Sequence, residues 1–345
     1  MHQYVLGVDG GNTKTVALVA SLDGAIVGMG RGGCGDIYNA RSVTGELTSK
    51  QAALANIELA VYTALAMAGI EPANLVASVF NMAGADWPED FVFLQAAMDE
   101  RGFGRKILVQ NDAMGVLHAG STSNIGVSLV CGTAVATGAR GPDGRIWHSS
   151  YWQDVVQGAE DMGQKALNAV YLAELGIAPA TSMAARFIEF YQVSTVEDIL
   201  YSMTSHNKRP RTQIAQLTPI LLDEAQAGDA VAARIVREHG HALGDYVQVA
   251  ARRVGLEHTP FTLVLAGGVF RHTSTLLSDA IIERAREKSP AMHPTRCRFE
   301  PSIGVLLTAL NNAGVTIDEA LLEQRLVPTI PEQTFFNTII ERAVL

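Results

Sequence analysis

Residues 5–15 read Val-Leu-Gly-Val-Asp-Gly-Gly-Asn-Thr-Lys-Thr, an apolar strand that runs into an acidic, glycine-rich turn. A second apolar run, Val16–Ala20, follows at once. Gly10 and Gly11 let backbone N–H groups approach an anion where a side chain would block the way. The stretch therefore predicts a phosphate-binding turn, although an Asp-Gly-Gly hairpin turn explains the same residues equally well.

The polar residues of this turn suit a phosphate site. Thr13 and Thr15 bring hydroxyl donors and Lys14 brings a positive charge. Asp9, at the end of the strand, is placed to hold a hydrated Mg²⁺. The structural alternatives are a strand-end carboxylate that stabilises the turn for Asp9 and a surface lysine for Lys14.

The same pattern recurs later in the chain. Val127–Val130 is an apolar strand, Gly132-Thr133 is a tight turn, and Ala134–Ala139 is again a strand. In both copies an Asp-Gly turn (Asp23-Gly24, then Asp143-Gly144) and a third strand follow, which is a strong hairpin signal. The repeat, about 120 residues apart, predicts two related half-domains that each offer a glycine turn to one ligand.

A third glycine pair follows another apolar run. Phe261–Ala266 reads as a strand, Gly267-Gly268 ends it, and Ser274–Lys288 reads as a helix. This arrangement predicts a further close backbone approach, here to a base or a ribose. By contrast, Gly28–Gly33 fits the dinucleotide fingerprint G-x-G-x-x-G, but no helix opens after it, so we do not expect NAD binding.

Composition limits the class of protein. The 345 residues, 48% of them apolar, are enough for two globular domains. No apolar run reaches the about 20 residues of a membrane span, and the first 25 residues lack the features of a signal peptide. We therefore expect a soluble, cytoplasmic protein without a membrane partner.

The net charge and the cysteines argue against two further kinds of site, one for nucleic acid and one for structural zinc. The formal net charge of −9 argues against a nucleic acid partner. The three cysteines, Cys34, Cys131 and Cys297, form no C-x-x-C pair, which argues for a reducing compartment and against structural zinc. The oligomeric state stays open, a homodimer included.

Periodicity predicts alternating strands and helices in the first half of the chain and mostly helix over 158–255. The elements expected in the first half are helices at Ala52–Gly69, Glu89–Arg101 and Met114–Ala119 and strands at Val76–Met82 and Lys106–Val109. Near the end, Phe299–Pro301 is predicted to finish a strand. Ser302–Ala313 is predicted to be a helix with Ser302 as its N-cap.

These motifs together resemble the sugar kinase, heat-shock ATPase and actin superfamily. The matching segments are Asp9–Thr15, Cys131–Thr133 and Leu265–Val269, which resemble its first phosphate, second phosphate and adenosine motifs. Within the superfamily, the chain is similar to the N-acetylglucosamine kinase family and its BadF/BadG/BcrA/BcrD-type ATPase relatives. Further similar segments are Ala83–Asp90, Gln110–Ala113 and Glu300–Gly304, so the resemblance spans residues 4–314.

The resemblance implies an α/β fold of two ribonuclease H-like domains, as in actin-like ATPases, with a nucleotide cleft between them. It implies an N-terminal domain over 1–117, a C-terminal domain with a helical insertion over 118–301, and a tail over 315–345. The helix at 302–314 would pack back toward the first domain. ATP and Mg²⁺ are the implied cofactors, with Asp9 on the metal and the nucleotide on Gly10, Gly11, Asn12, Thr13, Lys14, Gly132, Thr133, Gly267 and Gly268.

Asp112 is the implied catalytic base. It follows the strand Lys106–Val109, at the sheet edge where α/β folds bind ligands. Phosphoryl transfer to an alcohol needs a base that takes the hydroxyl proton. From the residues alone, an Asp there is better explained as the cap of the following helix. The resemblance favours the base.

The acceptor site departs from the family. Its predicted residues are Asp36, Gly84, Asp86, Asn111, Trp152 and Asp161. Asp36 stands where relatives have a sugar-binding Asn, the stretch 150–164 matches poorly, and Ala134 replaces the last glycine of Gly-Thr-Gly. A loop cap, a core aromatic and a helix N-terminal acid are the alternatives for Asp36, Trp152 and Asp161.

We therefore expect an ATP-dependent kinase that phosphorylates a hydroxyl of an amino sugar or related sugar. Two other classes stay open. One is an ATPase like the family's dehydratase and reductase activators, which share an iron–sulphur cluster held by paired cysteines. The other is a non-catalytic sugar sensor, which the presence of both Asp9 and Asp112 disfavours.

Overall fold

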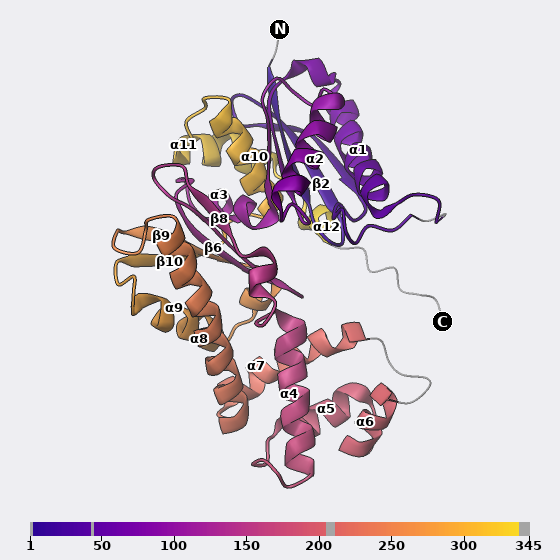
Figure 1. The fold of residues 1–345 in the computed structure, drawn as a ribbon, viewed down its shortest axis with the longest axis vertical. Coiled ribbons are helices and arrows are strands. Elements are labelled where there is room, and N and C mark those ends of the chain that lie inside the picture. Colours follow the sequence, from indigo (N-terminus) through magenta and orange to yellow (C-terminus); the bar gives the residue numbers. More distant parts are fainter. Residues whose placement is uncertain (1–2, 43–44, 205–210, 338–345) are drawn as a thin grey trace. The chain divides into compact units, whose positions relative to one another are not determined.

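The computed structural model describes residues 3–42, 45–204 and 211–337. The chain divides into two compact units (Figure 1). Unit 1 holds the residues up to Asn124 and from Cys297 onward, and unit 2 holds Ile125–Arg296. Residues 118–124 stay with unit 1 because the backbone N–H groups of Arg298 and Phe299 both bond to the carbonyl of Ala119.

Unit 1 contains a five-stranded sheet in the order β3-β2-β1-β4-β5. The hairpin strands β1, β2 and β3 are antiparallel, whereas β4 and β5 run parallel to β1. The carboxyl ends of β1, β4 and β5 therefore meet at one edge of the sheet. The strands are β1 Tyr4–Gly10, β2 Thr15–Ser21, β3 Ile26–Gly32, β4 Leu75–Met82 and β5 Ile107–Asn111.

Unit 2 repeats this topology. Its sheet has the order β8-β7-β6-β9-β10, again an antiparallel hairpin of three strands followed by two parallel ones. The strands are β6 Gly126–Cys131, β7 Val135–Arg140, β8 Ile146–His148, β9 Phe261–Ala266 and β10 Met292–Arg296. The repeat predicted from the two glycine turns is thus confirmed at the level of strand order.

Helices cover both faces of the first sheet (Figure 1). Helices α1 (Ser49–Ala68) and α2 (Pro88–Glu100) pack on one face, and α10 (Pro301–Asn312) packs on the other. The short elements of unit 1 are η1 Pro72–Asn74, η2 Asp112–Gly115, α3 Val116–Gly120, α11 Glu319–Leu321, η6 Leu322–Leu326, η7 Val327–Thr329 and α12 Gln333–Phe336. Leu322, Leu326 and Phe336 of the tail are buried against the α10 face.

Helix α1 lies very close to strand β3. A Cβ on Gly28, Gly30 or Gly32 would lie 2.0–2.2 Å from a carbonyl oxygen of α1. These glycines of the G-x-G-x-x-G-like stretch therefore serve helix packing. Among the described residues, α1 is the one helix long and apolar enough to cross a membrane. Its stripe of Ile57, Val61 and Leu65 is buried on the sheet, as in the core helix of a globular domain.

One predicted helix start is wrong. Helix α10 begins at Pro301 with Glu300 as N-cap, and Ser302 is buried within the first turn. Proline suits the first helical position because its φ is already helical and its missing N–H would have no partner there. Residues 299–301 also belong to no strand, since β10 ends at Arg296.

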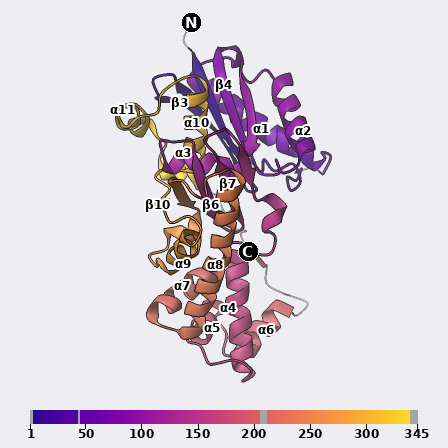
Figure 2. The same cartoon turned by 60° about the vertical axis from the view of Figure 1, so that its left-hand side comes forward.

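The second unit carries a large helical layer. Its helices are α4 Ala159–Glu174, α5 Met183–Tyr191, α6 Val196–Thr204, α7 Leu217–Ala227, α8 Ala230–Arg253 and α9 Leu276–Arg286, with short turns η3 Ser150–Gln153, η4 Arg211–Gln216 and η5 Gly268–Arg271. One continuous apolar core joins them to the sheet. Helices α8 and α9 lie side by side over it (Figure 2).

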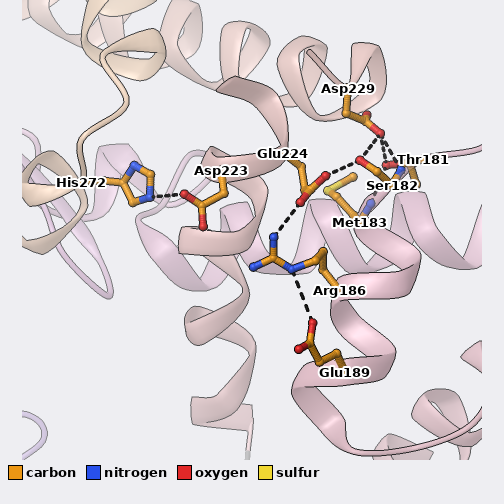
Figure 3. Close-up of polar contacts among 9 residues, drawn as sticks. All are labelled: Thr181, Ser182, Met183, Arg186, Glu189, Asp223, Glu224, Asp229 and His272. Carbon is orange, nitrogen blue, oxygen red and sulfur yellow. Dashed lines mark hydrogen bonds and ion pairs between the residues drawn. The ribbon is translucent and has the colours of Figure 1, made fainter. Parts of the chain in front are cut away.

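A polar network fixes the helical layer of unit 2 (Figure 3). Asp229 caps α8 by accepting from the N–H of Ala232 at 2.8 Å, and it also accepts from the hydroxyls of Thr181 and Ser182. On α7, Asp223 lies 3.2 Å from Nε2 of His272, which follows the third glycine pair. This second contact, separate from the hydrogen bonds of Asp229, connects α7 to the loop after β9 (Figure 3).

Candidate functional site

The first glycine turn lies at the carboxyl edge of the first sheet. The N–H of Gly11 donates to the carbonyl of Lys14 at 2.9 Å and closes the turn. A Cβ on Gly10 would lie 2.2 Å from the methyl of Met82, so a larger residue would push this side chain away. Asn12 and Thr13 are exposed at the tip. The predicted phosphate turn is therefore a closed loop with an accessible polar tip.

Asp9 is the second-to-last residue of β1 and lies within a cluster of acidic groups. Burial, Asp112 and Glu300 raise the pKa of its carboxyl to about 7, although Lys14 acts in the opposite direction. Carboxylate oxygens that repel one another are the donors that a hard divalent cation prefers. In the described part of the chain, no three His, Cys, Asp or Glu side chains are placed to hold a metal ion by themselves. The residues therefore fit Mg²⁺ bound by Asp9 together with waters and a phosphate.

Asp112 follows β5 directly and opens η2. Its neighbour Asn111 acts as the N-cap, since Oδ1 of Asn111 accepts from the N–H of Ala113 at 3.1 Å. Burial, then the charges of Asp86 and Asp36, raise the pKa of the Asp112 carboxyl to about 6. Such a carboxylate is mostly ionised at neutral pH and is more basic than an ordinary Asp, as a general base requires.

Three further predicted residues lie around Asp112. Nδ2 of Asn111 donates to Oδ1 of Asp86 at 3.1 Å and to the carbonyl of Ala85 at 3.2 Å. Gly84, with φ +80°, faces Asp36, because a Cβ there would lie 2.7 Å from Oδ1 of Asp36. Asp36, Gly84, Asp86 and Asn111 thus gather beside Asp112 within unit 1, as a binding site for hydroxyl groups requires. We call Asp36, Asp86 and Asp112 the carboxylate cluster.

The loop of Asp36 is tied to the glycine turn. The N–H of Gly35 donates to the carbonyl of Gly11 at 3.0 Å, and Thr15 Oγ1 donates to the carbonyl of Gly33 at 2.9 Å. The side chain of Asn39 reaches both Asp36, at 2.9 Å, and Asn12, at 3.1 Å. The candidate phosphate and hydroxyl sites are therefore parts of one hydrogen-bonded structure.

Sequence reasoning missed two supporting residues. Tyr38 Oη donates to the Asp90 carboxylate at 2.9 Å, and the same carboxylate accepts from the N–H of Trp87 at 2.9 Å. This pair ties the loop after β3 to the start of α2. The sequence signal for this pair was Asp90 itself, an acidic residue in the first turn of the helix that begins at Pro88.

Asn81 is a third residue that sequence reasoning missed. It lies opposite Asp9 in the neighbouring strand, is fully buried, and has no hydrogen-bond partner for Oδ1 or Nδ2 among the described residues. Paired residues of parallel strands point to the same face of a sheet. A buried amide therefore lies beside the candidate metal ligand.

In unit 2, the second and third glycine sites lie together. Gly267 has φ +106°, and a Cβ there would lie 2.3 Å from the carbonyl of Cys131. Gly132 closes its own turn by donating to the carbonyl of Ala134 at 2.9 Å. Thr133 is exposed, and the space around Gly268 is open. The turns after β6 and β9 thus present accessible backbone next to each other.

A pocket of about 570 Å³ adjoins the second turn. It is lined by Thr133, Ala134, Asp154, Val155, Gln157, Glu160, Asp161 and Gln164. Oδ2 of Asp161 accepts from the ammonium of Lys165 at 2.9 Å, so this predicted hydroxyl acceptor already has an ionic partner. Trp152 is 72% exposed, which excludes a place in the core.

His239 lies beside Lys165, the ionic partner of Asp161. Its Nδ1 lies 3.1 Å from Nζ of Lys165 and its Nε2 lies 2.9 Å from the carbonyl of Gln157. Burial and Lys165 lower the pKa of His239 to about 4, so the ring is neutral at pH 7. His239 therefore donates from Nε2 and accepts at Nδ1, which fixes α4 against α8.

The predicted site residues thus form two groups. Those on unit 1 are Asp9, Gly10, Gly11, Asn12, Thr13, Lys14, Asp36, Gly84, Asp86, Asn111 and Asp112; those on unit 2 are Gly132, Thr133, Trp152, Asp161, Gly267 and Gly268. Their roles, and the nucleotide cleft expected between the domains, stay predictions.

A family model and curated relatives match most of the chain. The model of the BadF/BadG/BcrA/BcrD ATPase family matches residues 6–309. An N-acetyl-D-glucosamine kinase of Dictyostelium discoideum is 24% identical over 319 residues, 90% of this chain and 98% of that protein. An N-acetylmuramic acid/N-acetylglucosamine kinase of Clostridium acetobutylicum is 24% identical over 280 residues, 80% of this chain and 89% of that protein.

Solved structures agree on the fold. A ROK family glucokinase of Streptomyces griseus, in complex with glucose and AMPPNP, has a TM-score of 0.55 at 16% identity, over 89% of this chain and 98% of that chain. A protein of Chromobacterium violaceum provisionally described as an N-acetylglucosamine kinase has a TM-score of 0.60 at 19% identity, with the same coverage. At these identities the likeness shows the fold alone, and it confirms the predicted α/β class with two domains.

The raised pKa of Asp112 has a consequence for stability. At a pH below the pKa that Asp112 has in the unfolded chain, its carboxyl is neutral in the folded and in the unfolded state. As the pH rises above that pKa, the unfolded chain loses the proton while the folded protein still keeps it, and this favours unfolding. Stability contributed by the neutral group is thus lost between the unfolded pKa and the folded pKa of about 6. We expect ligand-free Asp112→Asn, which cannot ionise, to be about 1 to 2 kcal/mol more stable than the parent at about pH 8.

Denaturant unfolding at about pH 4 and about pH 8 checks this, with the gain expected mainly at the higher pH. Asp90→Asn is the matched control, because Asp90 accepts hydrogen bonds from Tyr38 and Trp87 and its replacement should destabilise the protein. A loss of stability in Asp112→Asn at the higher pH would contradict the account.

Proposed function

The chain belongs to the BadF/BadG/BcrA/BcrD ATPase family, and from that premise we propose that it is an ATP-dependent sugar kinase. The acceptor is an amino sugar or related sugar. The observation that carries the proposal is the position of Asp112: a carboxylate with a raised pKa, next to the polar groups of Asp86 and Asn111 and to the acidic group Asp9. The curated relatives, both kinases of N-acetylglucosamine, support the same reaction.

In this mechanism Asp112 takes the proton of the acceptor hydroxyl, and the resulting oxygen nucleophile attacks the γ-phosphorus of ATP. The P–O bond to the β-phosphate breaks, which gives a sugar phosphate and ADP. Asp36, Asp86 and Asn111 orient the acceptor hydroxyls. The exposed tip of the first turn, at Asn12 and Thr13, binds phosphate, and the turns in unit 2 contribute further contacts to the phosphates and the nucleoside.

Asp9 is the residue proposed to hold Mg²⁺, through water. When bound, the ion neutralises charge on the phosphates. The positive charge of Lys14 already lowers the pKa of Asp9. The same charge would help to neutralise the bound phosphates.

The two other classes are less well supported. An iron–sulphur cluster needs accessible, paired thiols, but Cys131 is fully buried and burial raises its pKa to about 12. None of the three cysteines forms a disulfide bond within the described part of the chain. A non-catalytic sensor binds its sugar without taking a proton from it. It would therefore have no need for a carboxylate made more basic, as the raised pKa of Asp112 makes this one.

The first test removes the base. We expect Asp112→Asn to bind ATP and sugar with nearly unchanged affinity and to lose about three or more orders of magnitude in kcat, because the acceptor proton then has no base. Phosphate transfer from ATP to N-acetylglucosamine and glucosamine measures the activity, and calorimetry measures binding. Asp99→Asn, an exposed acid at the end of α2, is the matched control and should keep full activity. Near-normal turnover of Asp112→Asn would exclude it as the base.

The second test uses pH. Protonated Asp112 cannot accept a proton, so kcat/KM should fall below about pH 6 by about tenfold per pH unit. Because the charge of Asp86 raises the pKa of Asp112, Asp86→Asn should move this acid limb to lower pH. The pH–rate profiles of the two proteins give the comparison. An identical acid limb in both would show that another group controls it.

A further inference from the structure

We propose that Asn81 is a positioning residue of the divalent-cation site: its buried side-chain amide holds the water around the cation that Asp9 binds. The inference rests on the proposed function, which assigns the cation to Asp9 and gives Asn81 no role. It is argued from the strand register, from burial and from the hydrogen-bonding groups that the fold leaves unused.

Three polar side chains lie in one row across the sheet of unit 1. Asp9 of β1 lies opposite Asn81 of β4, and Asn81 lies opposite Gln110 of β5. Paired residues of neighbouring parallel strands are about 5 Å apart and point to the same face of the sheet. The carboxylate and the two amides therefore stand side by side, and we call these three residues the polar row.

The polar row lies on the face of the sheet that α10 covers. Val79, two positions before Asn81 and therefore on the same face, belongs to the apolar core that α10 shares. A Cβ on Gly115 in η2 would lie 2.8 Å from Nδ2 of Asn81 and 2.7 Å from Cγ2 of Val305 in α10. Both η2 and α10 thus press on the amide, and Nδ2 is the end nearest to them.

The amides of the polar row have hydrogen-bonding capacity that the protein does not use. Asn81 is fully buried, and neither its Oδ1 nor its Nδ2 has a partner among the described residues. Nε2 of Gln110, a residue only 4% exposed, is likewise without a partner there. Because an unbonded buried amide costs free energy of folding, such groups in proteins usually bond to ordered water or to a ligand.

Asp9 indicates which molecules these are. Burial and nearby charges set the pKa of its carboxyl, and no hydrogen bond from the described residues contributes. Its carboxylate is therefore left for the cation, and a bound Mg²⁺ usually keeps several waters. Each of these waters is a hydrogen-bond donor. Oδ1 of Asn81, the end of the amide away from Gly115, accepts from one of them.

The experiment measures how strongly the protein holds the cation, without any phosphate transfer. Calorimetry gives the dissociation constant of a non-hydrolysable ATP analogue with Mg²⁺ and with EDTA, and the ratio of the two constants is compared. Asn81→Val and Asn81→Thr have side chains of the same shape, and only Thr can bond to water. We expect Asn81→Val to lower the ratio by about tenfold and Asn81→Thr to stay within about threefold of the parent.

Ser78→Ala is the matched control. Ser78 lies on the same strand, is fully buried, and its Oγ has no partner among the described residues. It precedes Asn81 by three positions and therefore points to the opposite face of the sheet from Asp9. Loss of its hydroxyl should leave the ratio unchanged.

Thermal unfolding without ligand separates this role from a structural one. Asn81→Val should be at least as stable as Asn81→Thr, because an apolar group suits a position to which the protein itself offers no hydrogen bond. An Asn81→Val protein that is less stable than Asn81→Thr, or that does not fold while Asn81→Thr does, would show that the amide serves the fold. That result overturns the inference.

The metal ratios decide between the inference and the proposed function. An unchanged ratio in Asn81→Val, or an equal loss in both Asn81 variants, overturns the inference. If Asp9→Asn still abolishes the ratio, the proposed function stays intact. A parent protein that binds the nucleotide equally well with Mg²⁺ and with EDTA, or a ratio that Asp9→Asn does not change, overturns the metal role of Asp9 and the inference with it.

Discussion

The repulsion among acidic side chains at the carboxyl edge of the first sheet is the constraint on which unit 1 depends. Burial raises the pKa of both Asp9 and Asp112. The charges of Asp112 and Glu300 add to the shift of Asp9, whose pKa is about 7, and those of Asp86 and Asp36 add to the shift of Asp112, whose pKa is about 6. Such a cluster costs stability unless the surrounding structure holds it together. Asn111 donates a hydrogen bond to Asp86, and Asn39 and Tyr38 donate to Asp36, so the two carboxylates that act on Asp112 are held in place.

Close backbone approach is the second constraint, and both units use it. In unit 1, glycines on β3 admit α1, and Gly10 leaves room for Met82. In unit 2, Gly267 lies against Cys131 where a Cβ would overlap the backbone. In unit 2 this contact brings the turns after β6 and β9 together at one edge of the sheet. The same topology thus gives one unit a carboxylate cluster and the other an exposed pair of glycine turns.

Much of this was predictable from short-range signals. The Asp-Gly turns and the repeated glycine turn predicted both hairpins, and the strand before Asp112 predicted its place at the sheet edge. What the sequence could not predict depends on contacts between distant residues: the Tyr38–Asp90 bond, the buried amide of Asn81, and the neutral His239 between Lys165 and Gln157. The start of α10 was missed because Ser302 looks like a cap, whereas Pro301 already fixes the first turn.

The central proposal is that unit 1 binds the acceptor beside Asp112, and that the glycine turn of unit 1 and the two glycine turns of unit 2 bind the nucleotide. Hydrogen exchange measured by mass spectrometry tests it directly, with N-acetylglucosamine and a non-hydrolysable ATP analogue added separately. The account predicts that the sugar slows exchange around residues 36–39, 84–90 and 111–113, and that the nucleotide slows it around 10–14, 132–134 and 267–268. Slower exchange with sugar confined to unit 2, and none around Asp112, would contradict it.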